Sequence, residues 1–263
     1  RYSPNSANWD TSARLMQARM VRLNLSDAGL SATSQYFDSM GGWNKYHGWD
    51  TNAQSWMWKR GQGMDVLAWT GTDVARTINH SMNAVPEMMW IKNRSQSNDW
   101  IVYHKGLNGG TNPEQYYTVL NSSAAEVDLD TVWNDTAPTS SVITLGSHSH
   151  VNGNLDNFIG MLFSSVEGIS KCGYYDGSNS EQTITTGFQP RFLIIKRVDA
   201  GYAWFVLDTT RGWGSGNDSQ LELNTNNAAQ SHDFGAPTAT GFTLTSFDSY
   251  NISGGKFIYY AHA

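Results

Sequence analysis

The chain has 263 residues, a formal net charge of −6, and 15% charged against 39% hydrophobic residues. Gly, Ser, Thr and Asn are abundant instead, which is typical of an all-β protein with many turns and unlike a helical bundle. No Lys/Arg cluster could follow a phosphate backbone, and no apolar run approaches about 18 residues. We therefore expect no nucleic-acid partner and no membrane insertion.

Residues 1–62 are expected to be an N-terminal segment that holds only part of a repeat. The chain begins with Arg1 and shows no signal peptide, so we expect it to be a piece of a longer protein or a processed product. The only candidate helix is SARLMQARMVRL, residues 12–23, and its end also suits a strand. LNLSDA (23–28) and the apolar SWMW (55–58) match landmarks that recur later in the chain.

Residues 63–168 and 169–263 are predicted to be two copies of one domain of about 100 residues. In each copy a Pro is followed after six positions by a Lys and after fourteen by a Trp. An LN-x-x-x-A segment, an APT segment and a closing apolar run then follow in the same order, which chance turn chemistry would not reproduce. The landmark pairs are Pro86 and Pro190, Lys92 and Lys196, Trp100 and Trp204, Asn121 and Asn224, Pro138 and Pro237, and Asn152 and Asn251.

Each copy is predicted to consist of short strands. MMWI (88–91) and FLII (192–195) are apolar runs that begin just after a Pro and end in a polar turn. WIVYH (100–104) and WFVLD (204–208) follow, so each pair predicts a β-hairpin. Short strands at regular spacing favour tandem β-sandwich domains of jelly-roll-like architecture.

The MMWI and FLII runs are apolar at consecutive positions, so both faces of these strands must avoid water. One face would fill the sandwich core. The other face would pack against the neighbouring copy or another chain, or else be covered by the domain's own loops. The pattern leaves both alternatives open.

No catalytic signature is present: the chain lacks a Gly-x-Ser-x-Gly elbow, a phosphate loop, HExxH and CxxC. We expect no cofactor, and the single cysteine, Cys172, cannot form an internal disulfide. His148 and His150 would share one face of a strand and could begin a metal site with Asp156, but SHSH is better explained as a polar turn. We therefore expect no metal site.

The run EVDLDTVWND is acidic, and paired carboxylates can hydrolyse glycosides or hold calcium. The second copy has AQSHDFG in this place, with a single acid. A solvated strand edge is therefore the favoured interpretation, because edge acids also discourage unwanted strand pairing. The acids of the run are Glu126, Asp128, Asp130 and Asp135.

Nine of the eleven tryptophans fall into two groups. Those in apolar runs are predicted to lie in the core: Trp56, Trp58, Trp69, Trp90, Trp100 and Trp204. Glycines flank Trp43, Trp49 and Trp213, in GGWNKYHGWD (41–50) and RGWGSG (211–216), and loops of this kind often carry binding sites. If exposed, such rings give a flat platform for a sugar, whereas rings folded back would plug the sandwich or a subunit interface. The candidate ligand-contact residues are Trp43, Tyr46, Trp49 and Trp213.

Several motifs together resemble a repeated domain in virion structural proteins of tailed bacteriophages. They are SWMWKR, DVLAWTGT, VPEMMWIKNR, WIVYHKGL, WNDTAPTSSV and GGKFIYYAHA, preceded by DSMGGWNKYHG at 38–48. The resemblance extends from about residue 20 to the end. It implies a place in the phage particle, in a tail-fibre-like or other structural protein, and it carries over no catalytic residues.

We therefore expect a non-enzymatic virion protein, in a tail appendage rather than on the capsid surface. Its expected partners are other virion proteins, further copies of itself and a host-surface glycan. A purely structural spacer or capsid decoration protein is the first alternative. A polysaccharide depolymerase that uses the acidic run is the second.

Overall fold

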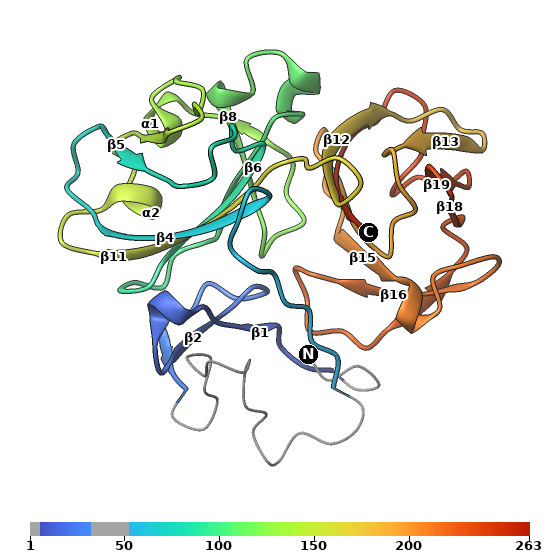
Figure 1. Ribbon diagram of the computed structural model, residues 1–263, viewed down its shortest axis with the longest axis horizontal. Coiled ribbons are helices and arrows are strands. Elements are labelled where there is room, and N and C mark those ends of the chain that lie inside the picture. Colours follow the sequence, from blue (N-terminus) through green and yellow to red (C-terminus); the bar gives the residue numbers. More distant parts are fainter. Residues whose placement is uncertain (1–5, 33–52) are drawn as a thin grey trace.

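The computed structural model describes residues 6–32 and 53–263, and β-strands dominate both ranges. Figure 1 shows three parts around a common centre: the N-terminal segment in blue, the first repeat in teal to yellow-green, and the second repeat in yellow to red. The predicted all-β fold class is confirmed. No helix in the described ranges is long and apolar enough to cross a membrane.

The first repeat contains a large antiparallel sheet of six strands. In spatial order they are β4 (Met64–Thr70), β11 (Asn157–Phe163), β6 (Met88–Asn93), β7 (Ile101–His104), β8 (Tyr116–Val119) and β9 (Val127–Asp128). The predicted hairpin is the β6–β7 pair, in which Met88 lies opposite His104. The acidic run reaches the sheet at β9, the edge strand, as the edge interpretation expects.

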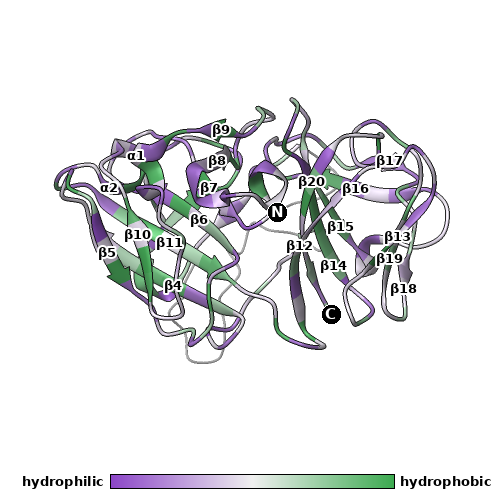
Figure 2. Ribbon diagram, turned by 90° about the horizontal axis from the view of Figure 1, so that it is seen from above, coloured by the Kyte–Doolittle hydropathy of each residue, from purple (hydrophilic) through white to green (hydrophobic). Residues whose placement is uncertain are grey.

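The second repeat contains a six-stranded sheet whose strands follow the same order. They are β12 (Ser170–Asp176), β20 (Lys256–His262), β14 (Phe192–Arg197), β15 (Trp204–Asp208), β16 (Asp218–Glu222) and β17 (Gln230–His232). The second predicted hairpin is the β14–β15 pair. Figure 2 shows hydrophobic residues concentrated on the central strands of both large sheets.

A smaller layer covers one face of each large sheet and completes a sandwich. In the first repeat it consists of β5 (Arg76–Asn79), β10 (Val142–Leu145), α1 (Asp130–Trp133) and α2 (Ser149–Asn152). In the second it consists of β13 (Gln182–Thr185), β19 (Gly241–Leu244) and β18 (Pro237–Thr238). Short 3₁₀ turns lie between strands: η2 (Leu107–Gly110), η3 (Pro113–Gln115) and η4 (Thr209–Arg211).

The two faces of β6 and of β14 are buried in different places. Met89 and Ile91 point into the first repeat's own sandwich core. Met88 and Trp90 point the other way, into a core that residues of both repeats and of the N-terminal segment share. Phe192 and the other residues of β14 divide in the same manner. Of the two alternatives from the sequence, packing between neighbouring copies is the one observed.

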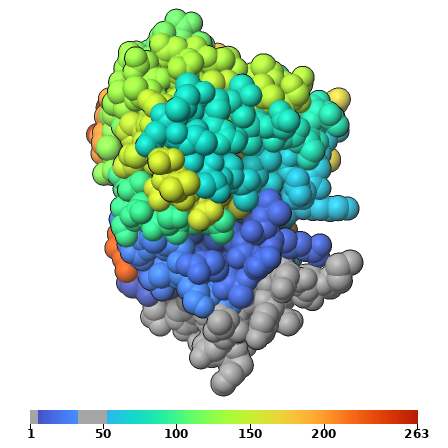
Figure 3. Space-filling view, turned by 90° about the vertical axis from the view of Figure 1, so that its left-hand side faces the viewer, coloured from blue at the N-terminus to red at the C-terminus, as the bar shows by residue number. Residues whose placement is uncertain are grey.

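The N-terminal segment forms a small antiparallel sheet of β1 (Asp10–Thr11), β2 (Arg19–Arg22) and β3 (Leu30–Ser31), in the order β1-β2-β3. The predicted helix at 12–23 is wrong. Only η1 (Arg14–Met16) is helical, because Gln17 then takes a positive φ of 53° and turns the chain into β2. The expected strand at the end of this stretch is confirmed. Figure 3 shows the blue segment lying directly against the first repeat.

A buried asparagine in each repeat fixes the smaller layer to the large sheet. The Asn152 side chain donates to the carbonyls of Val74 (2.8 Å) and Gly146 (2.9 Å) and accepts from the amide of Thr72 (3.1 Å). Asn251 does the same in the second repeat, where it donates to Ser180 (2.7 Å) and Thr245 (3.0 Å). Each asparagine side chain thus ties two loops together through their backbone groups.

Candidate functional site

Trp213 does not form part of an exposed binding surface, so the expectation for this residue is wrong. Its side chain is only 3% exposed and lies in the sandwich core of the second repeat. The indole Nε1 donates to the carbonyl of Gly235 (2.9 Å), and the ring packs edge-on against Phe242. Gly212 has a φ of 100°, which lets the chain fold back and bury the ring.

The other candidate ligand-contact residues, Trp43, Tyr46 and Trp49, lie outside the described residues. The aromatic site therefore stays a prediction for residues 43–49. The tryptophans of the apolar runs are placed as predicted, since Trp69, Trp90, Trp100 and Trp204 are buried and Trp56 and Trp58 pack against the shared core.

The His148–His150 pair lies at the start of α2 and not on a strand. His148 caps the helix, and its Nδ1 accepts from the amide of His150 (3.3 Å). Burial lowers the pKa of both imidazoles. Asp156, the suggested third ligand, instead accepts from the side chains of Asn93 (2.8 Å) and Gln96 (3.2 Å). Within the described ranges no three His, Cys, Asp or Glu side chains are grouped so that they could hold a metal ion.

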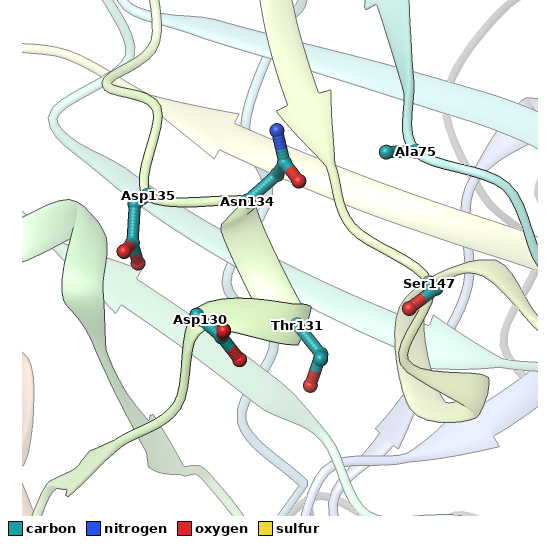
Figure 4. Close-up of a pocket in the computed structure, with 6 residues that line it drawn as sticks. All are labelled: Ala75, Asp130, Thr131, Asn134, Asp135 and Ser147. Carbon is teal, nitrogen blue, oxygen red and sulfur yellow. The ribbon is translucent and has the colours of Figure 1, made fainter.

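Two of the four acids in the run border a small polar pocket beside α1. Asp130 and Asp135 line it, and its volume is about 190 Å³. In Figure 4, Asp130 comes from the first turn of α1 and Asp135 from the loop that follows the helix, while Ser147 approaches from the loop before α2. The other lining residues are Ala75, Thr131 and Asn134.

The remaining two acids are placed differently. Asp128 lies on the edge strand β9. The Glu126 carboxylate accepts from the amide of Asn108 (2.7 Å), and burial raises its pKa. The run therefore does not form a single four-carboxylate site. The pocket offers two carboxylates and neighbouring hydroxyls, which suit a small polar or cationic ligand.

The two landmark lysines are buried, and each ammonium donates hydrogen bonds to several backbone carbonyls. The Lys92 ammonium donates to the carbonyls of Ser26 (2.9 Å) and Asn98 (2.5 Å). The Lys196 ammonium donates to the carbonyls of Ser123 (3.1 Å), Arg197 (2.6 Å) and Tyr202 (2.8 Å). Burial lowers the pKa of Lys92 to about 8 and that of Lys196 to about 7, while the carbonyl dipoles favour the charged form.

Each lysine reaches out of its own repeat. Ser26 belongs to the N-terminal segment and Ser123 to the first repeat, whereas the lysines lie on β6 and β14. In the sequence these lysines serve only to align the two copies, and their role between the units is not predicted there. A lysine within an apolar strand could have indicated this role, because a buried ammonium needs fixed hydrogen-bond acceptors.

Among known proteins, the chain matches one family model. A family model described as a domain of unknown function, DUF7483, matches residues 24–263. No curated protein and no solved structure matches the chain. The match covers most of the two described ranges, including both large sheets. The chain therefore belongs to the DUF7483 family.

Proposed function

We propose that this chain is a non-enzymatic structural protein of a tailed-bacteriophage particle, a tail-fibre-like module that binds other virion proteins. The motif resemblance supports the phage setting. The tandem repeat supports a multivalent part of a particle, because repeated modules supply avidity.

One observation carries the structural part of the proposal. The residues that the chain duplicates are the ones that join its units: Lys92 and Lys196 each donate to a carbonyl of the preceding unit. Met88 and Phe192 lie in the core that the units share. Duplication has thus kept the interface that joins the units within the chain, as expected for a structural module built of repeats.

Host-surface glycan binding is the second part of the proposal, and it now rests on Trp43, Tyr46 and Trp49. A spacer or capsid decoration role is the alternative that needs no ligand. The burial of Trp213 favours this alternative for the second repeat, since the ring is used for packing.

Antibodies against the purified chain, with gold labelling of intact particles, test the structural proposal. We expect the label on a tail appendage, together with recovery of the chain from purified particles by mass spectrometry. A protein made during infection but absent from purified particles would contradict the proposal. Label on the capsid shell would keep a structural role and replace the appendage by decoration.

Adsorption assays test the glycan part separately. We expect Trp43→Ala together with Trp49→Ala to lower binding of the purified protein to host cells at least about tenfold, because burial of one large apolar side chain contributes about 1.5–3 kcal/mol. The matched control is Met57→Ala, which removes an exposed apolar side chain from the same segment. Equal binding by both variants would leave only the spacer or decoration role.

The depolymerase alternative has a direct test of its own. The proposal predicts that the chain releases no reducing ends from host surface polysaccharide. Release that disappears in both Asp130→Asn and Asp135→Asn would contradict it and would make the pocket beside α1 a catalytic site.

A further inference from the structure

Three tryptophans, one in each part of the molecule, have the same local environment. Each backbone amide donates to the side-chain oxygen of an asparagine, and each tryptophan carbonyl accepts from the leucine just before that asparagine. The amide-to-oxygen distances are 2.9 Å for Trp9 and Asn24, 2.8 Å for Trp100 and Asn121, and 2.8 Å for Trp204 and Asn224. The N-terminal segment thus reproduces a feature that defines both repeats.

The three indoles connect the parts in a cycle. Each Nε1 donates to the carbonyl that lies two residues before the asparagine of a different part. Trp100 reaches Arg22 (2.8 Å) in the N-terminal segment, Trp204 reaches Val119 (3.0 Å) in the first repeat, and Trp9 reaches Glu222 (2.9 Å) in the second repeat. Every part therefore donates once and accepts once, and the series returns to its start.

A second set of contacts runs around the same cycle. The carbonyl two residues after each asparagine also accepts from a different part. Lys92 donates to Ser26 and Lys196 to Ser123, while in the third position the amide of Ala7 donates to Asn226 (3.0 Å). A backbone amide of the N-terminal segment thus takes the place that a lysine has in the repeats.

The centre of the cycle is apolar and continuous. The three tryptophans and their three leucine partners, Leu23, Leu120 and Leu223, belong to one buried cluster. Trp58, which follows the N-terminal sheet in the chain, packs against Phe163 of the first repeat (6.3 Å between ring centroids) and Phe192 of the second (5.6 Å). The Trp56 indole donates to the Asp208 carboxylate (2.7 Å). The N-terminal residues therefore contact both repeats.

We infer that residues 6–32 are the third unit of a closed, pseudo-threefold ring and that they lock the first repeat to the second. The interface between units is head-to-tail, and such an interface either closes into a ring or leaves two free ends. With two repeats alone, one junction would join them and two faces would stay uncovered. The N-terminal segment covers both faces with the contacts that the repeats use with each other.

If the ring is closed, a change at one junction should affect a distant junction, and this effect can be measured. The amide of Glu126 donates to the carbonyl of Val198 (2.7 Å) at the junction between the two repeats, and this contact includes no residue of the N-terminal segment. In a closed ring the other two junctions hold these two repeats together. Weakening the contacts of Trp9 therefore increases opening at the Glu126–Val198 junction.

Hydrogen exchange in the full chain, resolved by mass spectrometry, tests the inference with Trp9→Phe. We expect exchange at Glu126 and in residues 196–202 to become about fivefold faster, the factor that corresponds to one hydrogen bond of about 1 kcal/mol. The matched control is Trp133→Phe, which removes an indole bond to Tyr116 (2.9 Å) inside the first repeat and leaves the three junctions intact. Faster exchange confined to residues 6–32 and β16 would overturn the inference, because the segment would then be an appendage.

A disulfide variant gives the same test without loss of contacts. Ala7→Cys with Asn226→Cys places two thiols where an amide and a carbonyl are 3.0 Å apart, and the native Cys172 is buried. Oxidation should slow exchange at Glu126 and raise the melting temperature relative to the same protein reduced. An oxidised protein with unchanged exchange at Glu126 would contradict closure of the ring.

Discussion

Single buried polar side chains connect one part of this protein to the backbone of another. Lys92 and Lys196 bind carbonyls of the preceding unit, and His104 on β7 binds the carbonyl of Tyr259 on β20 (3.2 Å). Such groups are costly to bury and keep their position only when each polar atom has a partner. They therefore specify how the units meet in addition to stabilising them.

Titration of the buried His104 imidazole should make the free energy of unfolding depend on pH. Its Nδ1 accepts from the amide of Gly106 (3.0 Å), so Nε2 carries the proton, and burial lowers the pKa of the imidazole to about 3. Because the unfolded state has a pKa near 6.5, this stabilisation is complete above pH 6.5 and is lost as the pH falls toward 3, by at most about 1.4 kcal/mol per pH unit.

Urea unfolding between pH 7 and pH 4 checks this prediction in the native chain and in His104→Gln. The native chain should lose more free energy of unfolding over this range than the variant, which cannot titrate at this position. Parallel pH profiles for the two proteins would show that His104 does not contribute as described.

Replacing Lys196 by methionine should destabilise the protein because the ammonium group is lost, although the length of the side chain is kept. Lys196→Met keeps most of the aliphatic chain but removes the donor of three hydrogen bonds, and leaves the carbonyls of Ser123, Arg197 and Tyr202 short of a partner. We expect the free energy of unfolding to fall by about 2–3 kcal/mol. The control is Lys59→Met at an exposed position, which should change it by less than about 0.5 kcal/mol. Equal effects of the two substitutions would contradict a joining role for Lys196.

The two repeats share both the order of strands in the large sheet and the contacts between the two layers. The two large sheets share one order, and in each repeat a buried asparagine ties the loop after the first strand to the loop before the last. Asn152 and Asn251 lie at corresponding places just before β11 and β20. In each repeat, an asparagine at the same position thus connects the large sheet to the smaller layer.

Asn152→Ala should separate the layers of the first repeat. The substitution removes the donor to the Gly146 and Val74 carbonyls and the side-chain acceptor of the Thr72 amide, so we expect thermal or urea unfolding to show a loss of about 1–3 kcal/mol. Asn154→Ala, two residues along the chain and exposed, is the matched control with less than about 0.5 kcal/mol. A small effect at Asn152 would mean that the layers hold through apolar contacts alone.

Local patterns predicted the hairpins and the buried tryptophans, because apolar runs and turn residues act over a few positions. They failed at residues 12–23, where a single residue with positive φ, Gln17, ends the helix, and at Trp213, where flanking glycines permit burial as well as exposure. No local pattern shows that Lys92 and Lys196 bind a different unit. Such contacts depend on how units close around a centre, which sequence spacing does not record.

In the whole molecule, three parts meet in one buried cluster. Trp9, Trp100 and Trp204 each join two of them, and the N-terminal segment supplies one third of the contacts around the centre. The centre is therefore apolar and closely packed, with the three parts arranged around it. That arrangement suits a module that binds neighbours in a particle.

The most direct test of the account is a cryo-electron microscopy map of the intact phage particle at a resolution that shows side chains. We expect to find this chain in a tail appendage as a closed three-part unit, with Trp9 in contact with Glu222 and with further contacts to neighbouring virion proteins. A particle without the chain, or a chain in which residues 6–32 lie apart from the second repeat, would contradict it.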